Sequence, residues 1–138
     1  MKKPSKESAI FHMRIMARVF LLLGTANAVL VVAAGAYGAH ALKGQLSIEH
    51  ATLFQTALQY HMFHALGLLA VGVVATLRPA SILLAWAGGV MLMGIALFCG
   101  GLYVTTITGY RAFAVIAPFG GTAFMVAWVL FGIAVLRR

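Results

Sequence analysis

Long runs without a charged residue are the feature that most limits what this chain can fold into. Four such runs occupy residues 19–39, 57–77, 80–103 and 112–136. At a rise of 1.5 Å per residue, about 20 helical residues cross a hydrocarbon core roughly 30 Å thick. Each run is therefore long enough for one transmembrane helix. The sequence predicts an all-α membrane protein, a bundle of four transmembrane helices.

The composition excludes a water-soluble fold and leaves little room for catalysis. Of the 138 residues, 63% are hydrophobic and 9% are charged, whereas a soluble domain has about a quarter charged residues. Four spans of about 20 residues leave too little chain for a soluble catalytic domain. A single cysteine, Cys99, excludes an intrachain disulfide. Any chemistry must take place within or beside the bilayer.

The basic residues predict how the helices are oriented. Lys43 and Arg111 fall on one face of the membrane. Eight basic residues fall on the other face, namely Lys2, Lys3, Lys6, Arg14, Arg18, Arg78, Arg137 and Arg138. Because cytoplasmic segments carry the excess of Lys and Arg, the N-terminus and the C-terminus should both be cytoplasmic. This distribution explains the net charge of +8 as membrane anchoring, so we expect no nucleic-acid partner.

Two parts of the chain are distinguished by charge. Residues 1–18 form a basic leader, and residues 19–136 form a single transmembrane domain. Apolar residues alternate with Arg14 and Arg18 at the end of the leader, which suits an interfacial helix as well as a simple extension of the first span. Ser47 followed by Glu49 is typical of a helix start, so the second helix should begin near Ile48.

Small residues at four-residue spacing predict close helix packing, because they allow two backbones to approach each other in lipid. Packing within one chain is favoured over packing between copies. Proline is tolerated in a first helical turn, which suits the start of the last span. The predicted packing positions are Gly35, Gly38, Gly100, Gly101, Pro118, Gly120 and Gly121.

Histidines form the most suggestive polar feature of the spans. His61 and His64 are three residues apart, so they lie on one helical face and could point at one partner. Polar side chains in lipid are costly and usually face the bundle interior, a ligand or a hydrophilic path. The predicted topology brings several of them to the outer half of the bundle. This candidate polar cluster comprises His40, Gln55, Gln59, Tyr60, His61, His64 and Tyr103.

Three interpretations of the cluster remain open. The favoured one is an interhelical hydrogen-bond network that fixes the helices. The second is a metal or haem site, for which His40, His61 and His64 would be the ligands. The third is a path for protons or small solutes, although no acidic residue lies within any span. We predict no catalytic residue, and Cys99 is interpreted as a packing residue.

Motifs in all four spans resemble a known family of small bacterial inner-membrane proteins, the YgdD-like proteins that contain domain of unknown function 423. The eukaryotic transmembrane protein 256 is similar. The resemblance covers nearly the whole chain after the leader. Its motifs are Gly35–Leu42, Phe54–Tyr60 with His64–Leu66, Leu97–Tyr103, and Pro118–Gly121 with Trp128.

The resemblance implies a four-span protein of the bacterial inner membrane and leaves its activity unassigned. The family's motif positions fall on Gly38, His40, Gln59, Tyr60, His64, Gly101, Tyr103, Pro118 and Gly121. Where the third motif of the family usually has serines, this chain has Cys99 and Gly101. Any role of a hydroxyl group in that segment is thereby put in doubt.

The sequence thus favours a non-enzymatic accessory or scaffold protein without a resident cofactor. The alternative is histidine-based binding of metal or haem, or passage of a small solute or protons. The expected surroundings are the lipid bilayer, with a second copy of the chain or another membrane protein as the partner.

Reporter fusions test the predicted topology. Alkaline phosphatase fused to either end of the full chain should be inactive, because both ends should lie in the cytoplasm, where its disulfides do not form. The same enzyme inserted between residues 41 and 47 should be active. Opposite results at the two ends would contradict an even number of spans.

Overall fold

A computed structural model describes residues 6–78 and 81–137, and helices dominate this part of the chain. The elements are α1 (Lys6–His40), α2 (Ile48–Leu77), α3 (Ile82–Gly94), the π-helical segment η1 (Ile95–Gly100), α4 (Gly101–Thr108), the 3-10 helix η2 (Arg111–Ile116) and α5 (Ala117–Leu136). Because α3, η1 and α4 follow one another without a break, they form one rod. The same holds for η2 and α5.

The four rods confirm the predicted fold class. Each is long and apolar enough to cross a membrane: Arg14–His40, Ile48–Leu77, Ile82–Thr108 and Arg111–Leu136. The four uncharged runs of the sequence lie in these rods, apart from residue 80, which lies outside the described residues, and residue 81, which directly precedes α3. The described part of the leader continues directly into α1 as one helix of 35 residues.

Local signals explain where the helices begin and end. The Ser47 hydroxyl accepts a hydrogen bond from the backbone N–H of His50 at 3.2 Å, which confirms the predicted start of α2 at Ile48. Gly44 adopts a φ of 74° in the connection between α1 and α2, and Gly109 adopts the same φ between α4 and η2, a left-handed conformation that glycine adopts without a Cβ clash. Pro118 lies in the first turn of α5.

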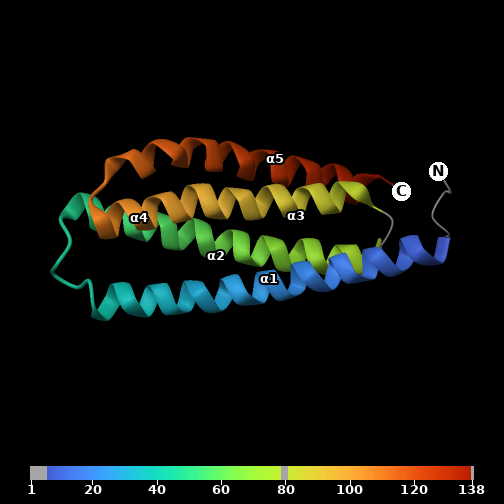
Figure 1. The fold of residues 1–138 in the computed structure, drawn as a ribbon, viewed down its shortest axis with the longest axis horizontal. Helices are drawn as coiled ribbons and strands as arrows, with labels where there is room; N and C mark the ends of the chain where they lie inside the picture. Colours follow the sequence, from blue (N-terminus) through green and yellow to red (C-terminus); the bar gives the residue numbers. More distant parts are fainter. Residues whose placement is uncertain (1–5, 79–80, 138) are drawn as a thin grey trace.

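The rods form two helical hairpins that lie side by side (Figure 1). The first hairpin pairs α1 with α2, and the second pairs the rod of α3, η1 and α4 with the rod of η2 and α5. Helix α2 is the central element, since it contacts α1 on one side and α3, η1 and α4 on the other. Helix α1 begins and α5 ends at the same end of the bundle (Figure 1). An even number of crossings follows from this arrangement.

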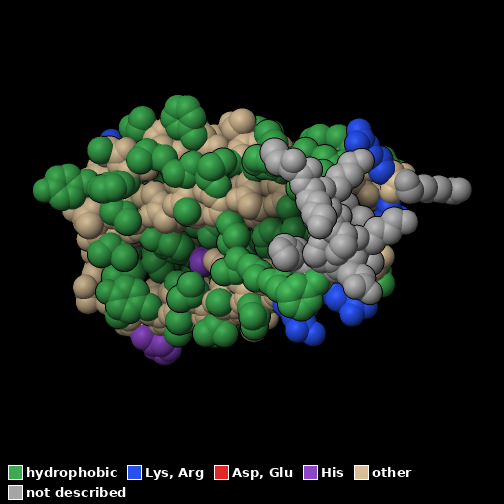
Figure 2. Space-filling view, turned by 45° about the vertical axis from the view of Figure 1, so that its right-hand side comes forward, with side chains coloured by type: hydrophobic (Ala, Val, Ile, Leu, Met, Phe, Trp, Pro, Cys, Tyr) green, Lys and Arg blue, Asp and Glu red, His purple; other side chains and the backbone are tan. Residues whose placement is uncertain are grey.

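Charged side chains connect the hairpins at both ends of the bundle. At the end where α5 finishes, the Arg78 guanidinium donates hydrogen bonds to the carbonyls of Ala134, at 3.1 Å, and Arg137. At the opposite end, Arg111 donates to both carboxylate oxygens of Glu49 at 3.1 Å. Figure 2 shows Lys and Arg side chains gathered mainly at the first of these ends, with hydrophobic side chains over the rest of that face.

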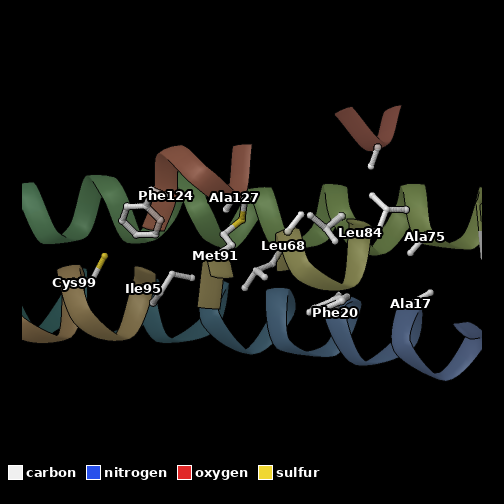
Figure 3. Packing of buried hydrophobic residues seen from close by; sticks show 13 residues of the cluster. Ala17, Phe20, Leu68, Ala75, Leu84, Met91, Ile95, Cys99, Phe124 and Ala127 are labelled. Carbon is white, nitrogen blue, oxygen red and sulfur yellow. The ribbon is translucent and has the colours of Figure 1, made fainter. Parts of the chain in front are cut away.

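Apolar side chains fill the space between the rods (Figure 3). Leu68 of α2 and Leu84 and Met91 of α3 are fully buried. The outward side of α1 remains apolar and exposed, as Leu22 and Val32 show. In water such a surface would be unfavourable, but in a bilayer it faces lipid chains.

A seven-residue stripe places α1 against α2. Ala17, Gly24, Val31 and Gly38 recur at this spacing and are buried or partly buried, which is the period of helices that pack side by side. A Cβ at Gly38 would lie 2.4 Å from the Phe54 ring. Gly35 is outside this stripe and has no other atom within 4 Å of the position of a Cβ. The structure therefore places Gly38, and not Gly35, at a close helix approach.

Glycines also bring the second hairpin together. A Cβ at Gly120 would lie 2.4 Å from the backbone nitrogen of Phe98, and one at Gly101 would lie 2.7 Å from the carbonyl oxygen of Phe113. The neighbouring positions are looser, because the nearest atoms lie at 4.0 Å for Gly100 and 3.8 Å for Gly121. Further close approaches occur at glycines that the spacing argument did not select, namely Gly24, Gly67, Gly72, Gly88 and Gly94.

Replacing Gly120 with alanine should destabilise the bundle. The new methyl group would meet the Phe98 backbone, which cannot turn aside as a side chain can, so we expect a loss of about 1–3 kcal/mol. Gly132→Ala is the matched control on the same helix, since nothing lies within 4 Å of its Cβ position. Better helix propensity should leave the control unchanged or up to about 1 kcal/mol more stable. Unfolding in detergent measures both, and equal stability of the two variants would contradict the close approach.

Candidate functional site

His61 and His64 are one helical turn apart on α2, yet they contact different helices. Both side chains are buried, with 6% and 3% of their surface exposed. His61 faces Asn27 of α1 and Tyr103 of α4. His64 stacks on Phe124 of α5. The two imidazoles therefore belong to two separate sites.

His61 is the centre of a closed hydrogen-bond network. Its Nε2 lies 2.9 Å from Oδ1 of Asn27, and its Nδ1 lies 3.3 Å from the Tyr103 hydroxyl. The Asn27 amide nitrogen donates to the carbonyl of Leu23 at 2.8 Å, which leaves Oδ1 as the acceptor. Nε2 of His61 must then carry the hydrogen, and Nδ1 accepts from Tyr103. Both ring nitrogens of a neutral histidine are thereby paired.

The geometry does not assemble the three histidines proposed as metal ligands. His40 is exposed at the end of α1, whereas His61 is buried 13 residues after the start of α2. Among the described residues, no group of three His, Cys, Asp or Glu side chains could hold a metal ion. Cys99 is buried among core residues.

The other members of the predicted cluster are spread over the half of the bundle that lies away from the chain's two ends. Gln55 and Gln59 are exposed on α2. Gln55 lines a small hollow of about 150 Å³ beside Gly38 and Lys43. The Tyr60 ring lies 4.7 Å from that of Phe98. The cluster therefore divides into three parts: the His61 network, the exposed glutamines of α2, and the surroundings of His64.

The ring of His64 is held in one orientation. Its Nδ1 lies 2.7 Å from the backbone carbonyl of Tyr60, and because a carbonyl only accepts, Nδ1 carries the hydrogen. The ring also stacks on Phe124, with 3.4 Å between centroids and 10° between planes. In the neutral imidazole, Nε2 is then a free acceptor. It makes no hydrogen bond within the described part of the chain.

His64 lines a groove between α2, η1 and α5. The groove has a volume of about 990 Å³ and is open on one side, a size that is ordinary for small-molecule sites. Aromatic side chains predominate in its walls. The lining residues are Gln59, Tyr60, Phe63, His64, Phe98, Pro118, Gly121, Thr122, Phe124, Met125, Trp128 and Val129.

The π-helical segment η1 shapes one wall of the groove. Phe98 lines the groove, while the next residue, Cys99, is buried in the core. A π-helical segment interrupts the regular spacing of side chains along an α-helix, and such segments occur frequently at functional sites. Beside the groove, the indole N–H of Trp128 is buried without a hydrogen-bond partner among the described residues. The groove thus has an unpaired acceptor in its wall, and an unpaired donor is buried beside it.

Comparison with known proteins places the chain in a family. Residues 34–121 match the family described as protein of unknown function (DUF423), and this range includes His61, His64 and Tyr103. The chain belongs to the DUF423 family. The resemblance seen in the sequence motifs is thereby confirmed.

Curated relatives of this DUF423 protein are named as membrane proteins. The chain is 39% identical to the UPF0382 membrane protein SERP0230 of Staphylococcus epidermidis over 87% of its length and 97% of the relative. It is 38% identical to the UPF0382 membrane protein YwdK of Bacillus subtilis over 87% of its length and 98% of the relative. No solved structure matches the chain.

Asn27 is a partner of His61 in this DUF423 protein that was not predicted from the sequence. A signal was available, because an asparagine in the middle of an apolar span is costly unless it is paired. Trp128 was named only as a motif residue, and its lining of the groove depends on the approach of α5 to α2. That approach is a tertiary contact, which no spacing within one helix predicts.

Loss of the His61 network should weaken the association of the helices. Asn27→Leu removes the acceptor of the His61 N–H and should cost about 1–2 kcal/mol. Tyr103→Phe removes the longer hydrogen bond, so it should cost less. Gln59→Ala is the control, because this side chain is exposed on the same turn of α2 as His61. Unfolding of the purified variants in detergent measures the three effects.

A double-mutant cycle decides whether the network acts as described. In the His61→Phe background, Asn27→Leu should cost much less than in the unmodified protein, since its partner is already absent. Additive effects of the two substitutions would show that Asn27 and His61 contribute independently and would contradict the network.

Proposed function

We propose that this protein is a non-catalytic accessory protein of the bacterial inner membrane that binds a membrane component in the groove between α2 and α5. The names of the relatives support the membrane location in general. The charge distribution supports both termini being cytoplasmic, so that the groove opens in the outer half and centre of the bilayer.

A contrast between the two buried histidines carries this proposal. Both ring nitrogens of His61 are hydrogen-bonded inside the bundle. This side chain therefore holds α1, α2 and α4 together and has no free nitrogen for a ligand. His64 is just as buried and equally well oriented, but its Nε2 is free and its ring lines an apolar groove. An acceptor that opens into an apolar groove within the membrane is costly unless a ligand pairs with it. The His64 side of α2 is therefore the side suited to binding.

The histidine-based alternatives have less support from the geometry. A ligand set of His40, His61 and His64 would require His61 to give up one of its two hydrogen bonds, because a ring nitrogen that binds a metal cannot also make a hydrogen bond. A path for solutes or protons would have to continue through the other half of the bundle. There Leu68, Val71 and Leu84 are fully buried between the helices, and they offer no hydrogen-bonding group.

Site-specific photo-crosslinking in cells tests the proposal. A photoreactive amino acid at Met125 or Val129 lines the groove, and both positions are exposed. We expect a discrete crosslinked species from either position. Val29 on the outward side of α1 is the control, because it is equally exposed but outside the groove. This position should give only the diffuse products of contact with bulk lipid.

The comparison between positions decides the outcome. Crosslinks that are equally diffuse at Met125, Val129 and Val29 would show that the groove is ordinary lipid-facing surface, and binding there would be excluded.

A further inference from the structure

We propose that the groove takes a lipid-phase amphiphile whose neutral head carries a hydroxyl group, and that Nε2 of His64 accepts the hydrogen bond from this hydroxyl. The inference rests on the proposed function and names the chemical class of the ligand. Three features support it: the free acceptor of His64, the unpaired donor of Trp128, and the depth of both in the bundle.

The hydrogen bonding of His64 determines what the head of the ligand must offer. Because Nδ1 donates to the Tyr60 carbonyl, a neutral imidazole presents an acceptor at Nε2. The ligand must therefore carry an O–H or N–H donor. Stacking on Phe124 restricts rotation of the ring, so the acceptor is already oriented before a ligand arrives. Preorganisation of this kind reduces the entropy lost on binding.

Trp128 makes a hydroxyl more suitable than a group that only donates. Its ring lines the groove, its N–H has no partner among the described residues, and its centroid lies 6.2 Å from that of His64. A hydroxyl oxygen that donates to Nε2 of His64 and accepts from the indole N–H requires these two nitrogens within about 5.6 Å of each other, the sum of two hydrogen bonds of about 2.8 Å. The indole N–H is covered by protein atoms, so the indole must turn toward the groove to donate this second bond.

The depth of His64 excludes ordinary phospholipid head groups. His64 lies about 24 Å from the start of α2 and about 20 Å from its end, at 1.5 Å per residue. It is thus near the centre of the bilayer, whereas charged head groups lie about 15 Å or more from the centre. A charged group at this depth would be costly, but a neutral hydroxyl with two partners is tolerated. The aromatic walls of the groove accommodate the apolar part of the same molecule.

Fluorescence quenching in phosphatidylcholine nanodiscs tests this assignment. In the full chain with Trp86→Phe, Trp128 is the single tryptophan, since the sequence contains two. The probe is 2-bromohexadecan-1-ol, whose bromine lies beside its hydroxyl, and the control is 1-bromohexadecane. We expect the alcohol to quench Trp128 saturably and to bind about fivefold more tightly than the bromoalkane, the factor produced by one ordinary hydrogen bond.

Replacing the acceptor tests the role of His64 itself. His64→Phe retains a ring that can stack on Phe124, and it should weaken binding of the alcohol about fivefold without changing quenching by the bromoalkane. Thr76→Val is the matched control on the same helix, because its hydroxyl donates to the Val73 carbonyl and the residue does not line the groove. This variant should bind the alcohol as the unmodified protein does.

The possible results separate this inference from the proposed function. Equal quenching by the alcohol and the bromoalkane would overturn the hydroxyl assignment, and so would a His64→Phe variant that keeps the full preference for the alcohol. If His64→Phe does not fold, the comparison of the two probes in the parent protein still decides. A discrete crosslink from Met125 to a second polypeptide, with no preference for the alcohol, would overturn the ligand class while retaining binding in the groove.

Discussion

The absence of water in the bilayer core is the constraint on which the rest of this structure depends. A polar side chain that enters the core is costly unless it pairs within the protein or with a ligand. The network from Tyr103 through His61 to Asn27 meets this requirement across three rods, and it ends on the carbonyl of Leu23 within α1. Because each donor faces an acceptor in sequence, the network defines how α1 and α4 sit against α2.

Close backbone approach is the second factor that fixes the bundle. Lipid chains are as apolar as leucine, so burial of hydrophobic surface drives helix association weakly in a membrane. Van der Waals packing then matters more, and it is strongest where two backbones come together. Gly120 against Phe98 and Gly101 against Phe113 are such places. They position α5 relative to the rod of α3 and α4, and thereby position the groove.

The sequence predicted the elements of this fold well and their lateral contacts poorly. The lengths of the uncharged runs predicted the four rods, and Ser47 predicted the start of α2. Both signals are local in the sequence. The pairing of Asn27 with His61 joins positions 34 residues apart, and it was not predicted. The i, i+3 spacing placed His61 and His64 on one face, but adjacent positions on one face can contact different neighbours. Which neighbour each contacts depends on how the hairpins pack.

A single turn of α2 thus separates a closed polar site from an open one. His61 and His64 have similar burial and lie 4.5 Å apart along the helix axis, at about 1.5 Å per residue. Their difference arises from their neighbours, since α1 and α4 present polar partners to His61, while α5 presents the face of Phe124 to His64. The face of an aromatic ring orients an imidazole but leaves its Nε2 without a hydrogen-bond partner. The His64 site is rigid and apolar, and its one free acceptor has no partner in the protein. A neutral amphiphile from the membrane can supply that partner.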